Sequence, residues 1–176
     1  MKILMHICCS NCAIYPLSVM TERGVVVKCL WFNPNIHPYM EYKNRLDALK
    51  RLHMLWNLDV QYIDDYGLIE YLRNVAGNEQ NRCEYCYEIR LEMTAKTAAN
   101  QSFDAFTTSL LISPYQKFDM IIDIGRAAGK KYSVEFFMED FRSGFRSSWE
   151  TGKKLNLYRQ KYCGCIYSEM ERYLKT

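Results

Sequence analysis

The stretch KILMHICCSNC, which runs from Lys2 to Cys12, decides the fold of this chain. Its first six residues, Lys2–Ile7, are mostly apolar and predict a short buried β-strand. Three cysteines follow at once, and a helix is expected from about residue 13 to residue 23, ending at Gly24. A strand, a turn and a helix in this order open a βα unit, and the cysteines occupy its turn.

Strand-like and helix-like patterns alternate along the rest of the chain. Strands are predicted over residues 25–33, 59–65, 104–111 and 133–140, and helices over residues 39–58, 68–75, 84–99 and 118–129. From Ser147 onward two helical pieces are expected, interrupted at the sequence YCGC. This alternation predicts an α/β fold, a three-layer sandwich with a mostly parallel five-stranded sheet and helices on both faces. In such sheets, ligands bind beyond the carboxyl ends of the strands.

The composition is that of one globular domain. The chain has 176 residues, of which 49% are apolar and 24% charged, so it can bury a sizeable core. A single domain is expected over residues 1–176, with a helical C-terminal segment from about residue 147 that contributes the last cysteines. The net charge of +3 is compatible with a nucleic-acid partner without requiring one. The sequence has no membrane-spanning run and no signal peptide, so a cytoplasmic location is expected.

Eight cysteines are many for a chain in a reducing compartment. Such a compartment disfavours structural disulfides, so metal binding or redox catalysis is the better interpretation. Cys83 and Cys86 form a CxxC pair before a predicted helix, which suits zinc, an iron–sulfur cluster or a redox dithiol alike. The adjacent Cys8 and Cys9 favour the larger iron–sulfur cluster, while Cys12 is either a further ligand or a helix-start cysteine that faces the core.

The C-terminal CxC motif has a different character. Cys163 and Cys165 flank Gly164, and a disulfide between them would close a very small, strained ring. Strained disulfides are labile or catalytic, so a redox-active dithiol is the first interpretation and a pair of metal ligands the second.

Other polar residues are expected at the same edge of the sheet. Asp140 closes the fifth predicted strand and can be a proton donor, a metal ligand or an ion-pair partner. Tyr115 follows the fourth predicted strand and offers either a phenol or a packing surface. A run of basic residues in the C-terminal part is a solvated surface or a phosphate-binding one. Its members are Arg142, Arg146, Lys153, Lys154, Arg159 and Lys161.

Six stretches in one order give the chain a specific resemblance. They are HICC, FNPNIHPYMEYKNRL, RCEYCYEIRL, TTSLLISPYQ, EDFR and LYRQKYCGC, and the match that rests on them extends over nearly the whole chain. In these stretches the chain resembles the QueH family of epoxyqueuosine reductases. It departs from the family's pattern at CCSNC, where many members have a proline.

The resemblance implies a fold, an activity and a cofactor. The fold would be of the adenine-nucleotide-hydrolase type, and the substrate would be tRNA that carries epoxyqueuosine at the wobble position. The reaction would remove the epoxide oxygen without cobalamin, using a [4Fe–4S] cluster and an external electron donor. The implied cluster ligands are Cys8, Cys9, Cys83 and Cys86.

The same resemblance implies roles for the remaining candidates. Cys163 and Cys165 would be the redox-active pair, and an additional iron could lie near Cys12 and Asp140. Asp140 and Tyr115 are the candidates for protonating the departing oxygen.

Two other classes of protein fit parts of the pattern. The first is a zinc- or cluster-binding module of the same fold that interacts with tRNA and has no reductase activity. The second is an ATP-dependent tRNA-thiolating enzyme, which needs a glycine-rich phosphate loop after the first strand. The sequence CCSNC has no glycine at that place, and this disfavours ATP chemistry.

Overall fold

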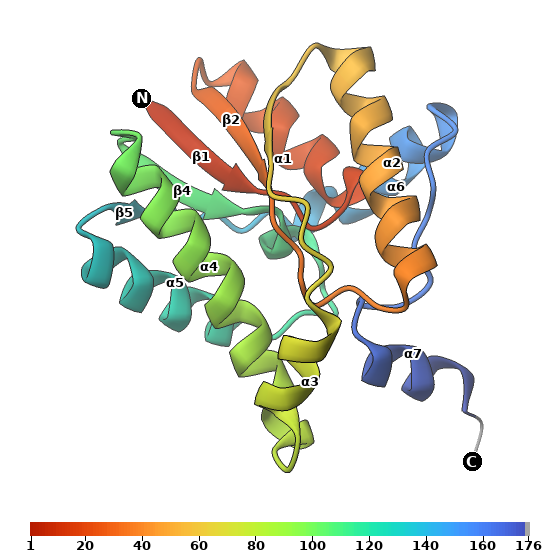
Figure 1. Cartoon of the computed structure of the whole chain (residues 1–176). Coiled ribbons are helices and arrows are strands. Elements are labelled where there is room, and N and C mark those ends of the chain that lie inside the picture. Colours follow the sequence, from red (N-terminus) through yellow and green to blue (C-terminus); the bar gives the residue numbers. More distant parts are fainter. Residues whose placement is uncertain (175–176) are drawn as a thin grey trace.

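A computed structural model describes residues 1–174. Its centre is a five-stranded sheet in the order β3-β2-β1-β4-β5, and every neighbouring pair of strands is parallel (Figure 1). The strands are β1 (Lys2–His6), β2 (Val26–Trp31), β3 (Asp59–Tyr62), β4 (Ala105–Thr108) and β5 (Glu135–Phe136). The sheet is thus entirely parallel, where the sequence analysis expected a mostly parallel one.

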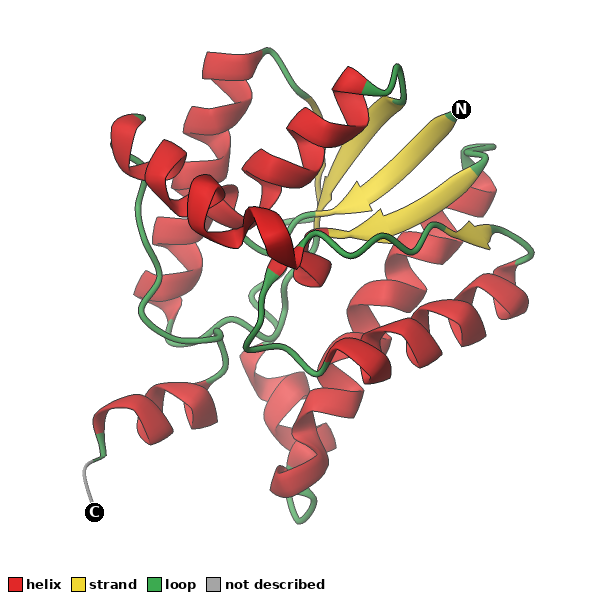
Figure 2. Cartoon of the chain, turned by 180° about the vertical axis from the view of Figure 1, so that it is seen from behind, coloured by secondary structure: helices red, strands yellow, loops and turns green. Residues whose placement is uncertain are grey.

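Helices cover both faces of the sheet and complete the three layers (Figures 1 and 2). The helices are α1 (Ser10–Glu22), α2 (Tyr39–Trp56), α3 (Leu68–Val75), α4 (Arg82–Asn100), α5 (Phe118–Tyr132), α6 (Phe145–Lys154) and α7 (Ile166–Tyr173). Short 3₁₀ segments are η1 (Glu79–Asn81), η2 (Ser109–Ile112) and η3 (Arg142–Gly144). Helices α1 and α2 contact each other on one face, where α6 also packs on α1, and α4 and α5 pack together on the other face.

The strand order creates a switch point between β1 and β4. From β1 the chain moves through α1 to β2 on one side, and from β4 it moves through α5 to β5 on the other side. His6 at the end of β1 pairs with Thr108 at the end of β4. The next residues of both strands therefore leave the sheet side by side, at the place where such folds bind ligands.

Several predicted boundaries were wrong, each for a local reason. Helix α1 begins at Ser10 because Cys9 is extended and its Sγ accepts a hydrogen bond from the Cys12 amide. Strand β4 ends at Thr108 because the Thr108 hydroxyl accepts from the Leu110 amide and starts η2. Strand β5 stops at Phe136, well before Asp140, because its pairing with β4 ends there, opposite Phe106.

The C-terminal segment is held against α1 by a close helix contact. A Cβ atom on Gly152 of α6 would clash with Asn11 Oδ1 of α1, so a larger residue at that crossing would displace the Asn11 side chain. The Ser148 hydroxyl of α6 also donates to the Asn11 carbonyl. Two helices separated near YCGC were predicted here, and α6 and α7 agree with that pattern, although α6 already begins at Phe145. The last two residues of the predicted segment, 175 and 176, lie outside the described residues.

No helix within residues 1–174 is long and apolar enough to cross a bilayer.

Candidate thiol-lined active site

Three thiols meet at the end of β1. The Sγ atoms of Cys8, Cys9 and Cys12 all lie within 4.8 Å of one another, and all three residues are buried. Adjacent cysteines in an extended segment would point to opposite sides, but here the chain turns from strand to helix between them. The backbone of Cys9 is extended and the next residue already belongs to α1, so the sulfurs of Cys8 and Cys9 are 4.0 Å apart. Three converging sulfur ligands can bind a metal ion.

Polar groups surround these sulfurs. The Ser109 hydroxyl at the start of η2 donates to Cys8 Sγ at 3.3 Å and accepts from the Cys8 amide at 3.0 Å. Gln160 Nε2, from the segment after α6, donates to Cys9 Sγ at 2.9 Å and to Cys12 Sγ at 3.5 Å. Three distant parts of the chain therefore supply the surroundings of this thiol group.

The three thiols differ in their pKa values. Hydrogen bonds from Cys12 and Cys9 hold the pKa of Cys8 well below its usual value, despite its burial. Hydrogen bonding to Cys8 raises the pKa of Cys12, and burial raises that of Cys9. Cys8 is therefore the thiol of the three that deprotonates first.

The CxxC pair lies in the first turn of α4, because α4 starts at Arg82, before the predicted start of this helix. Cys83 is half-buried and Cys86 is buried. Burial raises the pKa of Cys86 to about 12, although the guanidinium of Arg90 lies beside it. Arg90 Nη2 donates to Cys86 Sγ at 2.9 Å, and Arg90 Nε donates to the Cys86 carbonyl at 2.7 Å.

The backbone of the CxC motif is held by an arginine side chain of α2 and by the loop that precedes α2. Arg45 Nη1 donates to the Cys163 carbonyl at 2.9 Å, and Arg45 Nη2 donates to the Tyr162 carbonyl at 2.9 Å. The His37 amide donates to the Gly164 carbonyl at 2.7 Å. Gly164 has a φ of +149°, a conformation that residues with a side chain rarely adopt. The loop between the two thiols therefore has one defined path.

The two thiols of this motif face different environments. Cys163 is exposed, whereas Cys165 is buried in a small cluster with Tyr71, Val75 and Cys86. Gln116 Nε2 donates to Cys163 Sγ at 3.1 Å, and the Gln116 Oε1 accepts from the Tyr87 hydroxyl at 2.6 Å. Because Tyr87 fixes the amide orientation, the nitrogen end of Gln116 faces the thiol.

A cleft of about 600 Å³ opens over these groups. Its lining includes Cys8, Cys12 and Cys163, so thiols from both ends of the chain face one space. Aromatic residues (Tyr115, Phe145, Tyr162 and Trp149) and cationic residues (Arg45, Lys161 and Arg172) form much of the remaining wall. A space of this size is in the range of pockets that bind small organic molecules.

The two predicted proton donors lie in different places. Tyr115 lines the cleft, with its ring edge against Phe145 and 84% of its surface exposed. Asp140 is absent from the cleft lining and forms an ion pair with Arg142, with an Oδ2–Nη2 distance of 2.6 Å. The hydrogen bonds from Arg142 lower the pKa of Asp140, so this carboxylate carries no proton at neutral pH. The geometry therefore favours Tyr115 over Asp140.

Within residues 1–174, Cys8, Cys9 and Cys12 are the one group of three or more potential ligand residues close enough to share an ion. Cys83 and Cys86 are not within that distance, but the guanidinium of Arg90 interacts electrostatically with both Cys86 and Cys8. One buried cation thus interacts with a cysteine of each set. Their assignment as ligands remains a prediction.

Sequence reasoning missed the polar side chains that hold the thiols. These are Arg45, Arg90, Ser109, Gln116 and Gln160. The two arginines had a detectable signal, because each occupies a position on the apolar stripe of an amphipathic helix. The glutamines and the serine lie in loops or at the start of η2, where periodicity carries no information.

The fold and the cysteines define the class first. This is an α/β protein with a parallel five-stranded sheet between two helical layers, and with a buried cysteine group able to bind a metal. A solved structure with a similar fold is a predicted subunit of tRNA methyltransferase from Methanocaldococcus jannaschii, with a TM-score of 0.56. The match covers 87% of this chain and 76% of that one at 9% sequence identity, which shows the fold alone.

Sequence comparisons identify the family. The family model described as epoxyqueuosine reductase QueH matches residues 3–171. An epoxyqueuosine reductase QueH from Dehalococcoides mccartyi is 40% identical over 99% of this chain and 96% of its own length. Its counterpart from Thermotoga maritima is 32% identical over 97% of this chain and 91% of its own length. The chain belongs to the QueH family of epoxyqueuosine reductases, and its class of activity is that of an oxidoreductase.

Proposed function

We propose that this chain removes the epoxide oxygen of epoxyqueuosine at the wobble position of tRNA, without cobalamin, and leaves queuosine at that position of the tRNA. The reaction consumes two electrons and two protons and releases water. The observation that carries the proposal is that thiols from the end of β1 and from the C-terminal segment line one cleft at the switch point of the sheet, while Arg90 of α4 contacts the Cys86 sulfur and interacts with Cys8.

The donor set fits an iron–sulfur cofactor. Buried thiols are soft ligands that suit zinc or iron–sulfur clusters rather than magnesium or calcium. Cys8, Cys9, Cys83 and Cys86 would hold a [4Fe–4S] cluster, which supplies one-electron transfer when bound. Cys12 lies within the same sulfur group and could hold an additional iron. Asp140 fits that second role poorly, because Arg142 already occupies its carboxylate.

The chain's own residues complete the chemistry. Cys163 and Cys165 can store two electrons as a dithiol, which a one-electron cofactor cannot do alone. Cys163 lies in the cleft lining, where it can exchange electrons with groups that enter from solvent. Tyr115 lies on the same wall with its hydroxyl available as a proton donor. An external reductant restores the dithiol after each turnover.

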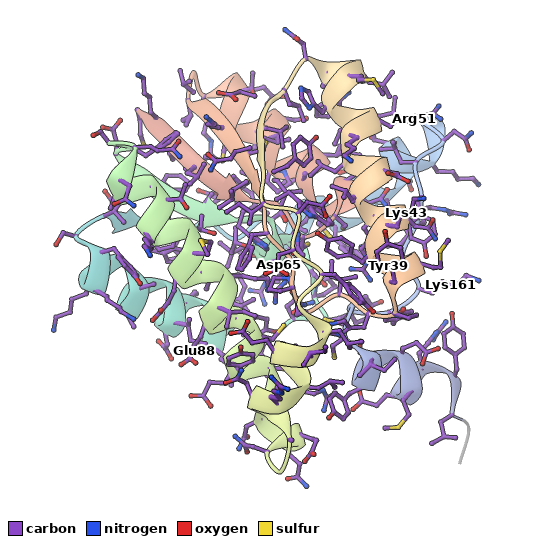
Figure 3. The ribbon with its side chains drawn as sticks, in the orientation of Figure 1. Tyr39, Lys43, Arg51, Asp65, Glu88 and Lys161 are labelled. Atoms are coloured by element: carbon purple, nitrogen blue, oxygen red, sulfur yellow. The ribbon has the colours of Figure 1, made fainter. Side chains whose placement is uncertain are left out.

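The residues around the cleft suit a tRNA substrate. The protein would act on this tRNA in the cytoplasm. A wobble base must leave the anticodon stack to enter a pocket, and Tyr115, Phe145 and Trp149 offer aromatic surfaces for it. Lys161 belongs to the cleft wall, and it lies on the same side of the molecule as Lys43 and Arg51 of α2 (Figure 3).

Two further cations are candidates for contacts with the tRNA backbone. Lys153 and Lys154, at the end of α6, are further candidates for phosphate contacts. The acidic Glu88 of α4 lies well away from Lys43, Arg51 and Lys161 (Figure 3).

The deciding experiment is anaerobic purification followed by an assay. We expect a brown protein that converts epoxyqueuosine-containing tRNA to queuosine with a strong one-electron reductant, as measured by mass spectrometry of the nucleosides. Cys83→Ala should lose colour and activity together, whereas Cys163→Ala should keep colour and lose turnover. Cys29→Ala is the control, because Cys29 is buried in β2, outside the cleft lining.

A colourless protein with stoichiometric zinc and no product would contradict the proposal and favour the tRNA-interacting module. Full turnover by Cys163→Ala would contradict the dithiol alone.

A further inference from the structure

Arg90 is a buried cation with unusual partners. Its side chain is 2% exposed, and it lies on α4 one turn after Cys86. The guanidinium donates to the Cys86 sulfur at 2.9 Å and to the Cys86 carbonyl at 2.7 Å. Its central carbon lies 5.6 Å from the centroid of the Tyr87 ring. The hydrogen bonds given for this charge are thus to a thiol and a carbonyl of one residue.

Arg90 lacks the partner that buried arginines usually have. Among residues 1–174, no carboxylate oxygen lies within 4.0 Å of its nitrogens. The other fully buried arginine, Arg45, has Glu41 Oε1 at 2.7 Å from its Nε. Because an uncompensated charge is strongly disfavoured in a protein interior, Arg90 requires a different anion.

Cysteines bound to a metal centre as thiolates would supply that negative charge. The charge of Arg90 is close enough to interact with Cys86, Cys163 and Cys8, and the Cys86 sulfur is in direct contact with it. These cysteines come from α4, the C-terminal segment and the end of β1, so the guanidinium lies among all three parts of the site. Two of them, Cys8 and Cys86, belong to the proposed cluster ligands. A cluster bound by four thiolates carries a net negative charge that grows when it takes up an electron.

We propose that Arg90 is the counter-charge of the thiolate-bound centre, and that it holds Cys86 in place and raises the reduction potential of that centre. This inference rests on the proposed function, because it requires the centre to be present. A fixed positive charge inside the protein favours the more negative, reduced state. Arg90 acts through Cys86 and is therefore a positioning residue rather than one that contacts the substrate.

The test is a redox titration of the bound centre in the purified, anaerobic holoprotein. The visible absorbance of the centre reports its redox state. We expect Arg90→Met to disfavour reduction at least tenfold in the equilibrium constant, which is a shift of about 59 mV to more negative potential for one electron. Arg90→Lys keeps the charge and should shift less. Lys96→Met is the matched control, because it removes one cation from an exposed position of the same helix and should leave the potential unchanged.

The outcomes separate the two proposals. A wild-type protein that assembles no centre contradicts the proposed function itself. A wild-type centre whose potential is unchanged in Arg90→Met contradicts only the role of Arg90. If Arg90→Met loses the centre, Arg90→Lys decides: retention of the centre supports the counter-charge, and equal loss shows that the shape of arginine is required instead of its charge.

Discussion

Arg45 and Arg90 are both buried and both donate hydrogen bonds to cysteine residues of the site, but their own charges are compensated differently. Arg45 on α2 pairs with Glu41, whose second oxygen accepts from the Tyr158 hydroxyl, and it holds the backbone of the CxC loop. Arg90 on α4 has no carboxylate partner among residues 1–174 and donates to the sulfur of Cys86. The first charge is neutralised within the polypeptide. The second indicates that folding leaves a positive charge for an anionic centre to balance.

Removing Arg45 should have the largest effect on stability. Arg45→Met leaves Glu41 buried without its cation, and we expect a loss of about 3–5 kcal/mol in the free energy of unfolding. Anaerobic urea denaturation of the metal-free protein measures it. Glu41→Leu combined with Arg45→Met should recover part of the loss, since no unpaired charge remains. Arg90→Met leaves no buried carboxylate behind and should destabilise the metal-free protein less; an equal loss would erase the difference between the two arginines.

The next prediction concerns the loop that Arg45 holds. A Cβ on Gly164 would lie 3.3 Å from the Ile36 side chain and 3.4 Å from Arg45 Nη1, at a φ of +149°. We expect Gly164→Ala to lower the free energy of unfolding by about 1–3 kcal/mol and to increase alkylation of the buried Cys165.

Gly77→Ala is the control for Gly164→Ala. Gly77 also has a positive φ, of +78°, but a Cβ there would meet nothing within 4 Å. Equal effects of the two substitutions would show that backbone strain alone, and not crowding against Arg45, determines the loss.

The sequence predicted the elements better than the contacts between them. The apolar run before Cys8 and the alternating pattern identified a parallel sheet, because burial on both faces requires continuous apolar strands. The length of β5 was overestimated, because only Glu135 and Phe136 pair with β4, opposite Ala105 and Phe106. The apolar pattern indicates which residues are buried, but it does not indicate where the pairing of two strands ends.

The site shows the same division between local and long-range information. Spacing alone singled out the cysteines, since thiols in CxxC and CxC arrangements are rare and chemically specific. Their partners are distant in sequence: Gln160 reaches Cys9 across 151 positions, and Ser109 reaches Cys8 across 101 positions. Such pairs exist only because the strand order brings β1 beside β4 and α6 packs on α1. A single sequence does not show which residues far apart along the chain come into contact.

A smaller effect should follow from removing the donor to Cys163. Gln116→Leu removes the amide hydrogen bond that lowers the pKa of Cys163, so this pKa should rise in the variant. One such bond is worth about 1 kcal/mol, so alkylation of Cys163 at neutral pH should slow about fivefold. Rates of iodoacetamide labelling resolved by peptide mass spectrometry measure it. Tyr87→Phe, which only releases the orientation of Gln116, should slow labelling less, and a faster rate in either variant would contradict the assignment.

The smallest effect is expected at Asp140, whose ion pair with Arg142 contrasts with the buried pair of Arg45. About half of each side chain is exposed, so water screens the charges and Asp140→Asn should change the free energy of unfolding by less than about 1 kcal/mol. Turnover should also stay close to wild type, because Asp140 lies outside the cleft lining and its carboxylate is ionised. Tyr115→Phe is the matched comparison, since it removes a hydroxyl from the cleft wall and should slow turnover. A tenfold drop in the turnover of Asp140→Asn with unchanged turnover of Tyr115→Phe would make Asp140, and not Tyr115, the proton donor. The proton would then come from the loop that follows β5.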